Sequence, residues 1–138
     1  TAGQERFAPL AAPYFRNADG VMVTYDVTRR STFERLESFW LEEVAKKAAP
    51  DATRMLVGTK AEGRGEARQV DRDEAQDLAD RNGMLHFETS AMTGLMVHDA
   101  FYLMTCTIMN RQIESDPKNL INSNVTLAPG SVKKAGCC

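Results

Sequence analysis

The 138-residue chain lacks the features of several common protein classes. Its three cysteines are an odd number, and two of them are adjacent at the C-terminus, so a disulfide framework is a poor interpretation. No Cys or His pair has the spacing of zinc ligands. This pattern predicts a reduced, metal-free protein of the cytosol. The sequence also has no apolar run of about 18 residues, the length that indicates a transmembrane helix.

An excess of positive charge is absent as well. Seventeen Lys and Arg against nineteen Asp and Glu give a net charge of −2, which argues against nucleic acid as a partner bound through a basic surface. The first residues have neither the charged start nor the apolar middle of a signal peptide, and the chain begins at Thr1 without a Met. The missing Met raises the hypothesis that the sequence is a fragment.

What is present is typical of a folded domain. Hydrophobic residues make up 43% and charged residues 26% of the chain, and the length is that of one ordinary domain. Short apolar stretches predict three buried strands, at residues 21–27, 54–60 and 84–89.

Helices are predicted between and after these strands. One begins at Ser31 and another at Asp71, and each start is followed three residues later by Glu, as in a capping box. The first helix is predicted to end by Pro50 and the second at Gly83. A last amphipathic helix is predicted over residues 97–115. Strands that alternate with helices predict parallel βαβ units and hence an α/β fold.

Composition divides the chain into two parts. Residues 1–115 contain all the predicted strands and helices and are interpreted as one domain. Residues 116–138 are rich in Pro, Asn, Ser and Gly, and helical periodicity stops there. They are therefore predicted to form a flexible tail rather than a second domain.

Polar motifs follow two of the predicted strands. In an open parallel sheet, ligands bind outside the carboxyl ends of the strands. The second strand is followed by GTKAE (Gly58–Glu62), the third by ETSAM (Glu88–Met92), and the chain begins with TAGQERF (Thr1–Phe7). Each motif is weak by itself: GTKAE alone is better explained as a turn at a strand end with an exposed Thr-Lys pair.

Together, in this order and spacing, the three motifs resemble those of the Ras-like small GTPases, and of the Rab branch in particular. Residues 14–18 (YFRNA) are similar to the Rab sequence YYRGA, and residues 25–28 (YDVT) match a Rab strand end. The resemblance extends from Thr1 to about Ile113 and returns at the end of the tail. It implies the C-terminal portion of a P-loop NTPase-like parallel-sheet fold, acting as a membrane-trafficking switch that binds and hydrolyses GTP.

For the nucleotide phosphates, the resemblance implies roles for two residues. Gln4 would orient the attacking water, as the corresponding Gln of Ras-type enzymes does. Gly3 would lend its backbone N–H to the γ-phosphate, where a side chain would obstruct the approach. GTP or GDP and Mg²⁺ are the expected ligands of the complete protein, and no metal ligand is assigned in this chain.

For the guanine base, the resemblance implies six residues: Thr59, Lys60, Glu62, Ser90, Ala91 and Met92. Lys60 would lay its stem along the guanine plane, Ala91 would donate its N–H to the guanine carbonyl oxygen, and Ser90 would brace the loop. Two positions depart from the family. Glu62 stands where Asp is usual, and the extra methylene moves its carboxylate forward, which predicts weakened guanine binding. Met92 replaces a Lys, which removes one polar contact.

A surface for partner proteins is implied by the same resemblance. Phe7, Leu10 and Tyr14, with Phe15 beside them, would form an apolar switch surface for an exchange factor, a GTPase activator and effector proteins. Packing in the core is the alternative for these side chains, and for Phe15 the two interpretations are equally supported.

The adjacent cysteines at the end of the chain, Cys137 and Cys138, resemble the Rab ending that carries two prenyl groups. Two lipid chains anchor a protein more stably than one, and Lys133 and Lys134 would add attraction to an anionic leaflet. The expected location is the cytoplasmic face of intracellular membranes. Two exposed, inert thiols are the alternative.

The largest departure from the family is a missing phosphate loop. No GxxxxGK[ST] occurs in the sequence, and the first switch with its magnesium-binding Thr is also missing. A chain that is one part of a longer protein is the simplest explanation. The alternative is a real loss, which would leave a nucleotide-free pseudo-GTPase acting as a membrane-tethered protein-binding module. A nicotinamide-dependent enzyme is disfavoured, because no GxGxxG turn is present.

Overall fold

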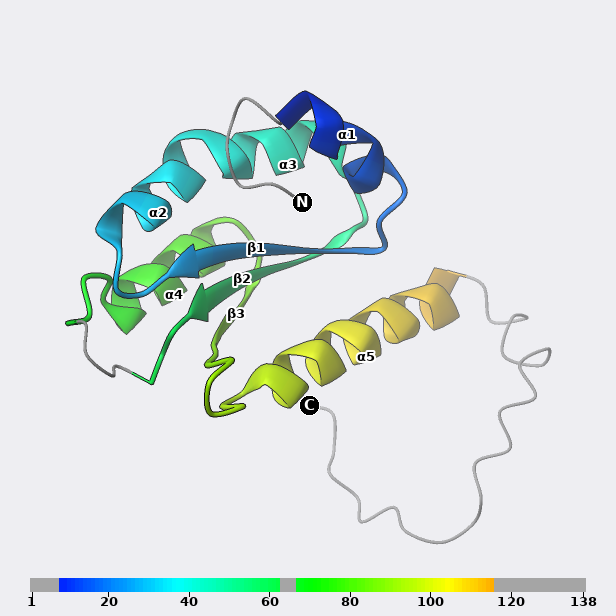
Figure 1. Cartoon of the computed structure of the whole chain (residues 1–138). Coiled ribbons are helices and arrows are strands. Elements are labelled where there is room, and N and C mark those ends of the chain that lie inside the picture. Colours follow the sequence, from blue (N-terminus) through cyan, green and yellow to red (C-terminus); the bar gives the residue numbers. More distant parts are fainter. Residues whose placement is uncertain (1–7, 63–66, 116–138) are drawn as a thin grey trace, which may run out of the picture.

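The computed structural model describes residues 8–62 and 67–115. Its sheet contains three parallel strands in the order β1-β2-β3 (Figure 1). Their bounds are β1 (Gly20–Asp26), β2 (Thr53–Thr59) and β3 (Leu85–Glu88). Each strand overlaps one of the predicted ranges, and the expected α/β fold with a parallel sheet is confirmed.

Helices make the connections between the strands. Three of them follow one another without a break between β1 and β2 and form one helical rod, α4 lies between β2 and β3, and α5 follows β3 (Figure 1). The helices are α1 (Ala8–Arg16), the rod of α2 (Arg30–Arg35), η2 (Leu36–Trp40) and α3 (Leu41–Lys47), then α4 (Arg72–Arg81) and α5 (Val97–Ser115). Helical crossovers of this kind are what allow consecutive strands to run parallel.

Apolar side chains cover both faces of the sheet. On one face, Val23 and Leu56 belong to a core shared with the α2–α3 rod and with α4. On the other face, Met55 packs with Ala100 and Met104 of α5. The middle strand β2 is therefore buried on both sides, which explains why its sequence is continuously apolar rather than alternating.

The predicted capping box at Ser31 is wrong. α2 begins at Arg30, and its capping residue Arg29 makes no side-chain bond to the helix. Thr32 acts instead: its Oγ1 donates to the Arg29 carbonyl oxygen at 2.7 Å and accepts from the Asp26 backbone N–H at 3.0 Å. One hydroxyl thus links the end of β1 to the first turn of α2, a task that the neighbouring Ser31 does not perform.

The limits of α4 agree with the sequence signals. Asp71 caps its start by accepting a hydrogen bond from the Asp73 N–H at 2.8 Å. After its end, Gly83 has a φ of 61°, and the Met84 N–H returns to a carbonyl oxygen of the last turn at 2.9 Å. Glycine adopts this left-handed geometry without a steric cost. The cap at Asp71 and the end at Gly83 are confirmed, whereas Glu74 bonds a residue of α2 instead of completing the box.

The sequence does not predict α1 or the π-helical turn η2. α1 has no acidic residue in its first turn and contains Pro13, which is unfavourable inside a helix. η2 lies within a segment whose apolar spacing continues as if the helix were regular. The rod ends at Lys47, three residues before Pro50.

Several predictions fall outside the described residues. These are the phosphate-site residues Gly3 and Gln4, the switch residue Phe7, the cysteines Cys137 and Cys138, and the flexible tail at 116–138. They stay predictions.

Candidate functional site

Three loops meet where the carboxyl ends of the strands lie, and we call this part of the sheet with its loops the carboxyl edge. They follow β1 at Asp26, β2 at Thr59 and β3 at Glu88, and Figure 1 shows these strand ends on the same side of the sheet. The loops after β2 and β3 are joined by the Ala61 N–H, which donates to the Thr89 carbonyl oxygen at 3.0 Å. The structure thus brings the motifs GTKAE and ETSAM together, although 30 residues separate Gly58 from Glu88.

Gly58 supports this edge from inside β2 and is not a turn residue. It pairs with Tyr25 of β1, and a Cβ at Gly58 would lie only 2.8 Å from the Tyr25 Oη and 2.9 Å from its Cζ. Real Cβ atoms essentially never approach another atom so closely. Glycine at this position therefore allows the Tyr25 ring to lie across β2.

Tyr25 is fixed at its far end by a short polar chain. Its Oη lies 3.2 Å from His86 Nε2, and His86 Nδ1 lies 3.1 Å from Gln76 Oε1. Because an amide oxygen only accepts, Nδ1 carries the imidazole proton and Nε2 accepts from the phenol. Burial raises the pKa of Tyr25 and lowers the pKa of His86, so both groups stay neutral.

Lys60 begins the first loop with an unusual backbone. Its φ is 63°, in the left-handed region that few residues other than glycine adopt. The preceding Thr59 bonds the Tyr25 carbonyl oxygen through its Oγ1 at 2.7 Å. The Lys60 ammonium meets Asp26, with Nζ 2.7 Å from Oδ2. Burial raises the pKa of Asp26, but hydrogen bonds from Lys60 and Thr28 outweigh it and hold that pKa below its ordinary value.

Glu62 and Ser90 form the second polar pair of the carboxyl edge. The fully buried Ser90 accepts from the Thr93 N–H at 3.2 Å, and its hydroxyl bonds the Glu62 carboxylate. That bond lowers the pKa of Glu62. The Glu62 Oε2 is shielded from solvent and has no hydrogen-bond partner among the described residues. An oriented carboxylate with one buried acceptor lacking a donor fits a ligand that presents N–H groups.

The remaining predicted residues lie in two places, the loop after β3 and the helix α1 that precedes the amino end of β1. Ala91 and Met92 are exposed in the loop that follows β3. On α1, Tyr14 is 71% exposed, whereas Phe15 is 8% exposed and belongs to the core. Core packing is therefore the correct interpretation for Phe15. Leu10 lies in α1, and its side chain is outside the described part of the structure.

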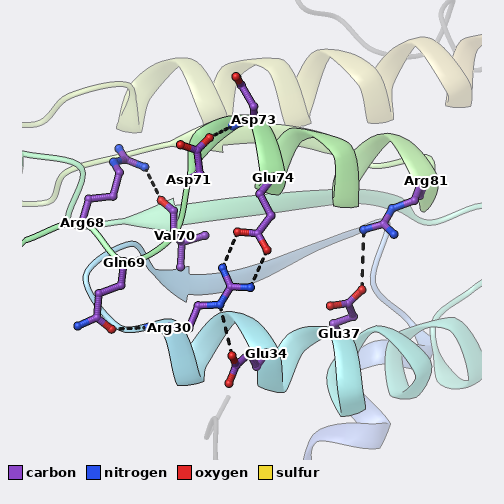
Figure 2. A network of polar contacts seen from close by, with 10 residues as sticks. All are labelled: Arg30, Glu34, Glu37, Arg68, Gln69, Val70, Asp71, Asp73, Glu74 and Arg81. Carbon is purple, nitrogen blue, oxygen red and sulfur yellow. Dashed lines mark hydrogen bonds and ion pairs between the residues drawn. The ribbon is translucent and has the colours of Figure 1, made fainter.

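The sequence did not predict an ion-pair frame formed by Arg30 with Glu74, which Figure 2 shows, and by Arg68 with Glu88. Arg30 of α2 bonds both oxygens of Glu74 on α4, at 2.5 and 2.6 Å. Arg68 bonds both oxygens of Glu88 at 2.6 and 2.8 Å. The Gln69 N–H donates to the Val27 carbonyl oxygen at 2.8 Å, which draws the segment before α4 against the end of β1. The partners in these bonds are 20 to 44 residues apart, so no local sequence pattern predicts the bonds.

A profile of the Ras family matches residues 1–110 of the chain. The chain belongs to the Ras family. Its relatives include the Ras-related protein Rab-2B of Dictyostelium discoideum, which is 43% identical over 122 residues, covering 88% of this chain and 59% of that protein. The Ras-related protein Rab-4 of the same organism is 42% identical, with 99% of this chain and 70% of that protein covered.

The Ras-related protein Rab-8A of Gallus gallus is 33% identical, over 98% of this chain and 66% of that protein. These relatives identify the chain as a Rab-type member of the Ras family, as its motifs predicted. It spans about 59% to 70% of the length of these three relatives.

Two further findings apply to the described residues of this Ras-family chain. No helix within residues 8–62 and 67–115 is long and apolar enough to span a membrane. The same residues contain no cluster of His, Cys, Asp and Glu that could hold a metal ion. The carboxyl edge is better suited to a guanine base than to a metal ion, because the buried Glu62 Oε2 can accept a hydrogen bond from an N–H group of the base.

Proposed function

We propose that this chain supplies the guanine-recognition part of a Rab-type GTPase, which binds and hydrolyses GTP as a switch in membrane trafficking. The guanine site consists of Thr59, Lys60, Glu62, Ser90, Ala91 and Met92. The observation that carries the proposal is the Glu62 carboxylate, which Ser90 orients and whose Oε2 is buried without a partner among the described residues.

The chemistry of the base explains the preference for guanine. Guanine presents a ring N–H and an amino group on one edge, and a carboxylate accepts from both. Adenine presents an unprotonated ring nitrogen there, which would leave the Glu62 oxygen without its donor. A site built to pair with a donor discriminates strongly against a ligand that lacks it. Lys60 supplies an apolar stem for the ring face, and the Ala91 N–H donates to the guanine carbonyl oxygen.

Hydrolysis is proposed to use residues near the start of the chain. Gln4 orients the attacking water, and the Gly3 N–H binds the γ-phosphate. GTP and Mg²⁺ are the ligands of the complete protein, and Mg²⁺ neutralises phosphate charge when bound. An activator protein that supplies an arginine accelerates such reactions by about 10³–10⁵. A nucleotide-free binding module is not supported by the comparisons.

Partner and membrane contacts form the last part of the proposal. Exchange factor, activator and effectors are proposed to bind through Phe7, Leu10 and Tyr14, of which Tyr14 is exposed on α1. Cys137 and Cys138 are proposed to carry prenyl groups that hold the protein on the cytoplasmic face of intracellular membranes.

Nucleotide titration followed by NMR tests the guanine site. GDP is expected to shift the backbone signals of Lys60, Glu62 and Ala91 in the ¹⁵N-labelled 138-residue chain, whereas ADP is not. Glu62→Gln is expected to lose the GDP response. Glu74→Gln, which alters a carboxylate of the ion-pair frame, is the matched control and is expected to keep it. Equal responses to GDP and ADP would contradict guanine recognition.

Cell fractionation tests the lipid anchor. The chain is expected in the membrane fraction, Cys137→Ser is expected to be partly released, and the variant with both cysteines changed to Ser is expected in the cytosol. A double variant that remains with membranes contradicts anchoring at these cysteines.

A further inference from the structure

Asp26 lies where two strands of the carboxyl edge end together. It is the last residue of β1 and pairs in register with Thr59, so Lys60 is the first residue beyond this pair. The Asp26 side chain is only 14% exposed, whereas that of Lys60 is 49% exposed. The ion pair between them therefore joins a sheltered carboxylate to a half-exposed lysine side chain.

Asp26 is held on several sides. Its Oδ1 accepts from the Thr28 N–H at 2.9 Å and from the Thr28 Oγ1 at 2.6 Å, while Oδ2 faces the Lys60 ammonium. The Asp26 backbone N–H is bonded to Thr32 Oγ1 at 3.0 Å. The position of the carboxylate is therefore set by Thr28 as well as by Lys60. In contrast, Glu42 and Lys46 on α3 form a pair in which both side chains are more than 60% exposed.

We propose that Asp26 is a positioning residue for nucleotide recognition, and that it acts by holding the Lys60 ammonium so that the Lys60 stem lies extended along the carboxyl edge. The proposal rests on the guanine site described above. Lys60 follows the end of β2 with a left-handed backbone, and its Nζ lies 2.7 Å from Asp26 Oδ2. Fixing both ends of the side chain, at the backbone and at Nζ, presents its methylene groups as a flat apolar surface before any ligand arrives.

The size of the effect follows from side-chain ordering. Immobilising one flexible side chain on binding costs an amount that corresponds to roughly 2- to 12-fold in affinity. Without Asp26, the Lys60 side chain is ordered only when the ligand binds, and the free energy of ordering it weakens binding. Because the stem would contact the base rather than the phosphates, guanosine and GDP should lose affinity by the same factor.

Charge masking is the competing role for Asp26. If Asp26 served only to neutralise Lys60, then its removal would leave an uncompensated ammonium beside an anionic ligand. GDP would then bind more tightly, and guanosine would be unaffected. The two ligands therefore separate positioning from masking.

The test compares four proteins, which are the wild type, Asp26→Asn, Lys60→Met and the double variant, with one control variant. Asn keeps an oxygen for the Thr28 bonds and replaces Oδ2 with an NH₂ group, which cannot accept from the ammonium. Met keeps an unbranched stem without charge. Glu43→Gln is the control, because Glu43 pairs with Lys47 on α3 and is also mostly buried, at 18% exposure. Affinities of the 138-residue chain for guanosine and for GDP are measured by NMR titration.

The expected result is a loss of roughly 2- to 12-fold for both ligands in Asp26→Asn, no loss in Glu43→Gln, and no further loss when Asp26→Asn is added to Lys60→Met. A wild-type affinity retained in Asp26→Asn, or a tighter GDP complex, overturns the proposal. Equal losses in the Lys60→Met background also overturn it, because Asp26 would then act independently of Lys60.

A second measurement needs no ligand and separates this proposal from the proposed function. The Asp26 carboxyl is titrated by ¹³C NMR in wild type and in Lys60→Met, and its pKa is expected to rise when the ammonium is removed, since Lys60 helps to keep it low. An unchanged pKa shows that the pair does not form and overturns the positioning role. A wild-type chain that forms the pair but responds to neither guanosine nor GDP refutes the guanine site instead.

Discussion

The carboxyl edge and the ion-pair frame use the same kinds of side chain in opposite ways. In the frame, Arg30 bonds both oxygens of Glu74, and Arg68 bonds both oxygens of Glu88. At the carboxyl edge, Glu62 bonds Ser90 through one oxygen and keeps the other buried without a partner among the described residues. A complete set of partners indicates a structural role, and an incomplete one indicates a place for a ligand.

The largest difference between the two regions should appear in ligand binding. Glu62→Gln is expected to weaken GDP binding by about 10- to 150-fold, because the variant exchanges a charged acceptor for a neutral amide. The melting temperature should hardly change. Glu62→Asp is expected to tighten binding, because the shorter side chain withdraws the carboxylate. Calorimetric titration with GDP measures the affinity of both variants. An unchanged affinity in Glu62→Gln would mean that the Glu62 carboxylate does not bind the ligand and that the carboxyl edge does not differ from the ion-pair frame in this respect.

The next effect concerns the support beneath the carboxyl edge. Gly58→Ala is expected to destabilise the fold by about 1–3 kcal/mol, because the new methyl group meets the buried Tyr25 ring. Gly20→Ala is the matched control: its methyl group meets the flexible ends of Ile108 and Met104, which can move aside. Urea denaturation of both variants measures the difference. Equal losses would mean that the Tyr25 ring is free to shift.

A smaller effect is expected within the frame. Glu74→Gln is expected to cost about 0.5–1 kcal/mol of stability and no GDP affinity, because Arg30 and Glu74 are both more than a third exposed and solvent screens their attraction. Urea denaturation gives the stability, and GDP titration gives the affinity. A loss of GDP affinity in this variant would show that the frame is coupled to the edge.

The smallest effect is a dependence on pH. Burial lowers the pKa of His86 in the folded state, and the unfolded value is about 6.5. The folded chain thus binds fewer protons between these two values, so the contribution of His86 to stability is complete above pH of about 6.5 and is lost as the pH falls toward the folded pKa. His86→Gln should flatten this decline in urea midpoints measured from pH 7 to pH 5. His98→Gln is the control for loss of an imidazole, and a similar flattening in it would contradict the assignment.

Local signals predicted the elements that depend on local geometry. Asp71 caps α4 and Gly83 closes it because both act on backbone groups within a few residues. The strands followed from continuous apolar sequence, since β2 is covered on both faces. The polar motifs also met at one edge, as parallel strands require.

What the sequence did not predict depends on distant partners. Arg30 and Glu74 are 44 residues apart, and only the packing of α2 near α4 turns Glu74 away from its expected capping role. The sequence predicts a helix start at Ser31, whereas the bonding of Thr32 depends on the position of the β1 end, which is not visible in the local sequence. The contact between Lys60 and Asp26 can be predicted only when the register between β1 and β2 is known, and the sequence alone does not give that register.

The π-helical turn η2 has a consequence for changes in chain length. A π turn holds more residues than an α-helical turn of similar rise. Deleting one residue within Leu36–Trp40 would allow the rod to become a continuous α-helix that still joins β1 to β2. A deletion in α2 or α3 would instead rotate the buried side of the rod by about 100°. The middle of the rod is therefore where this fold should accept the loss of a residue most readily.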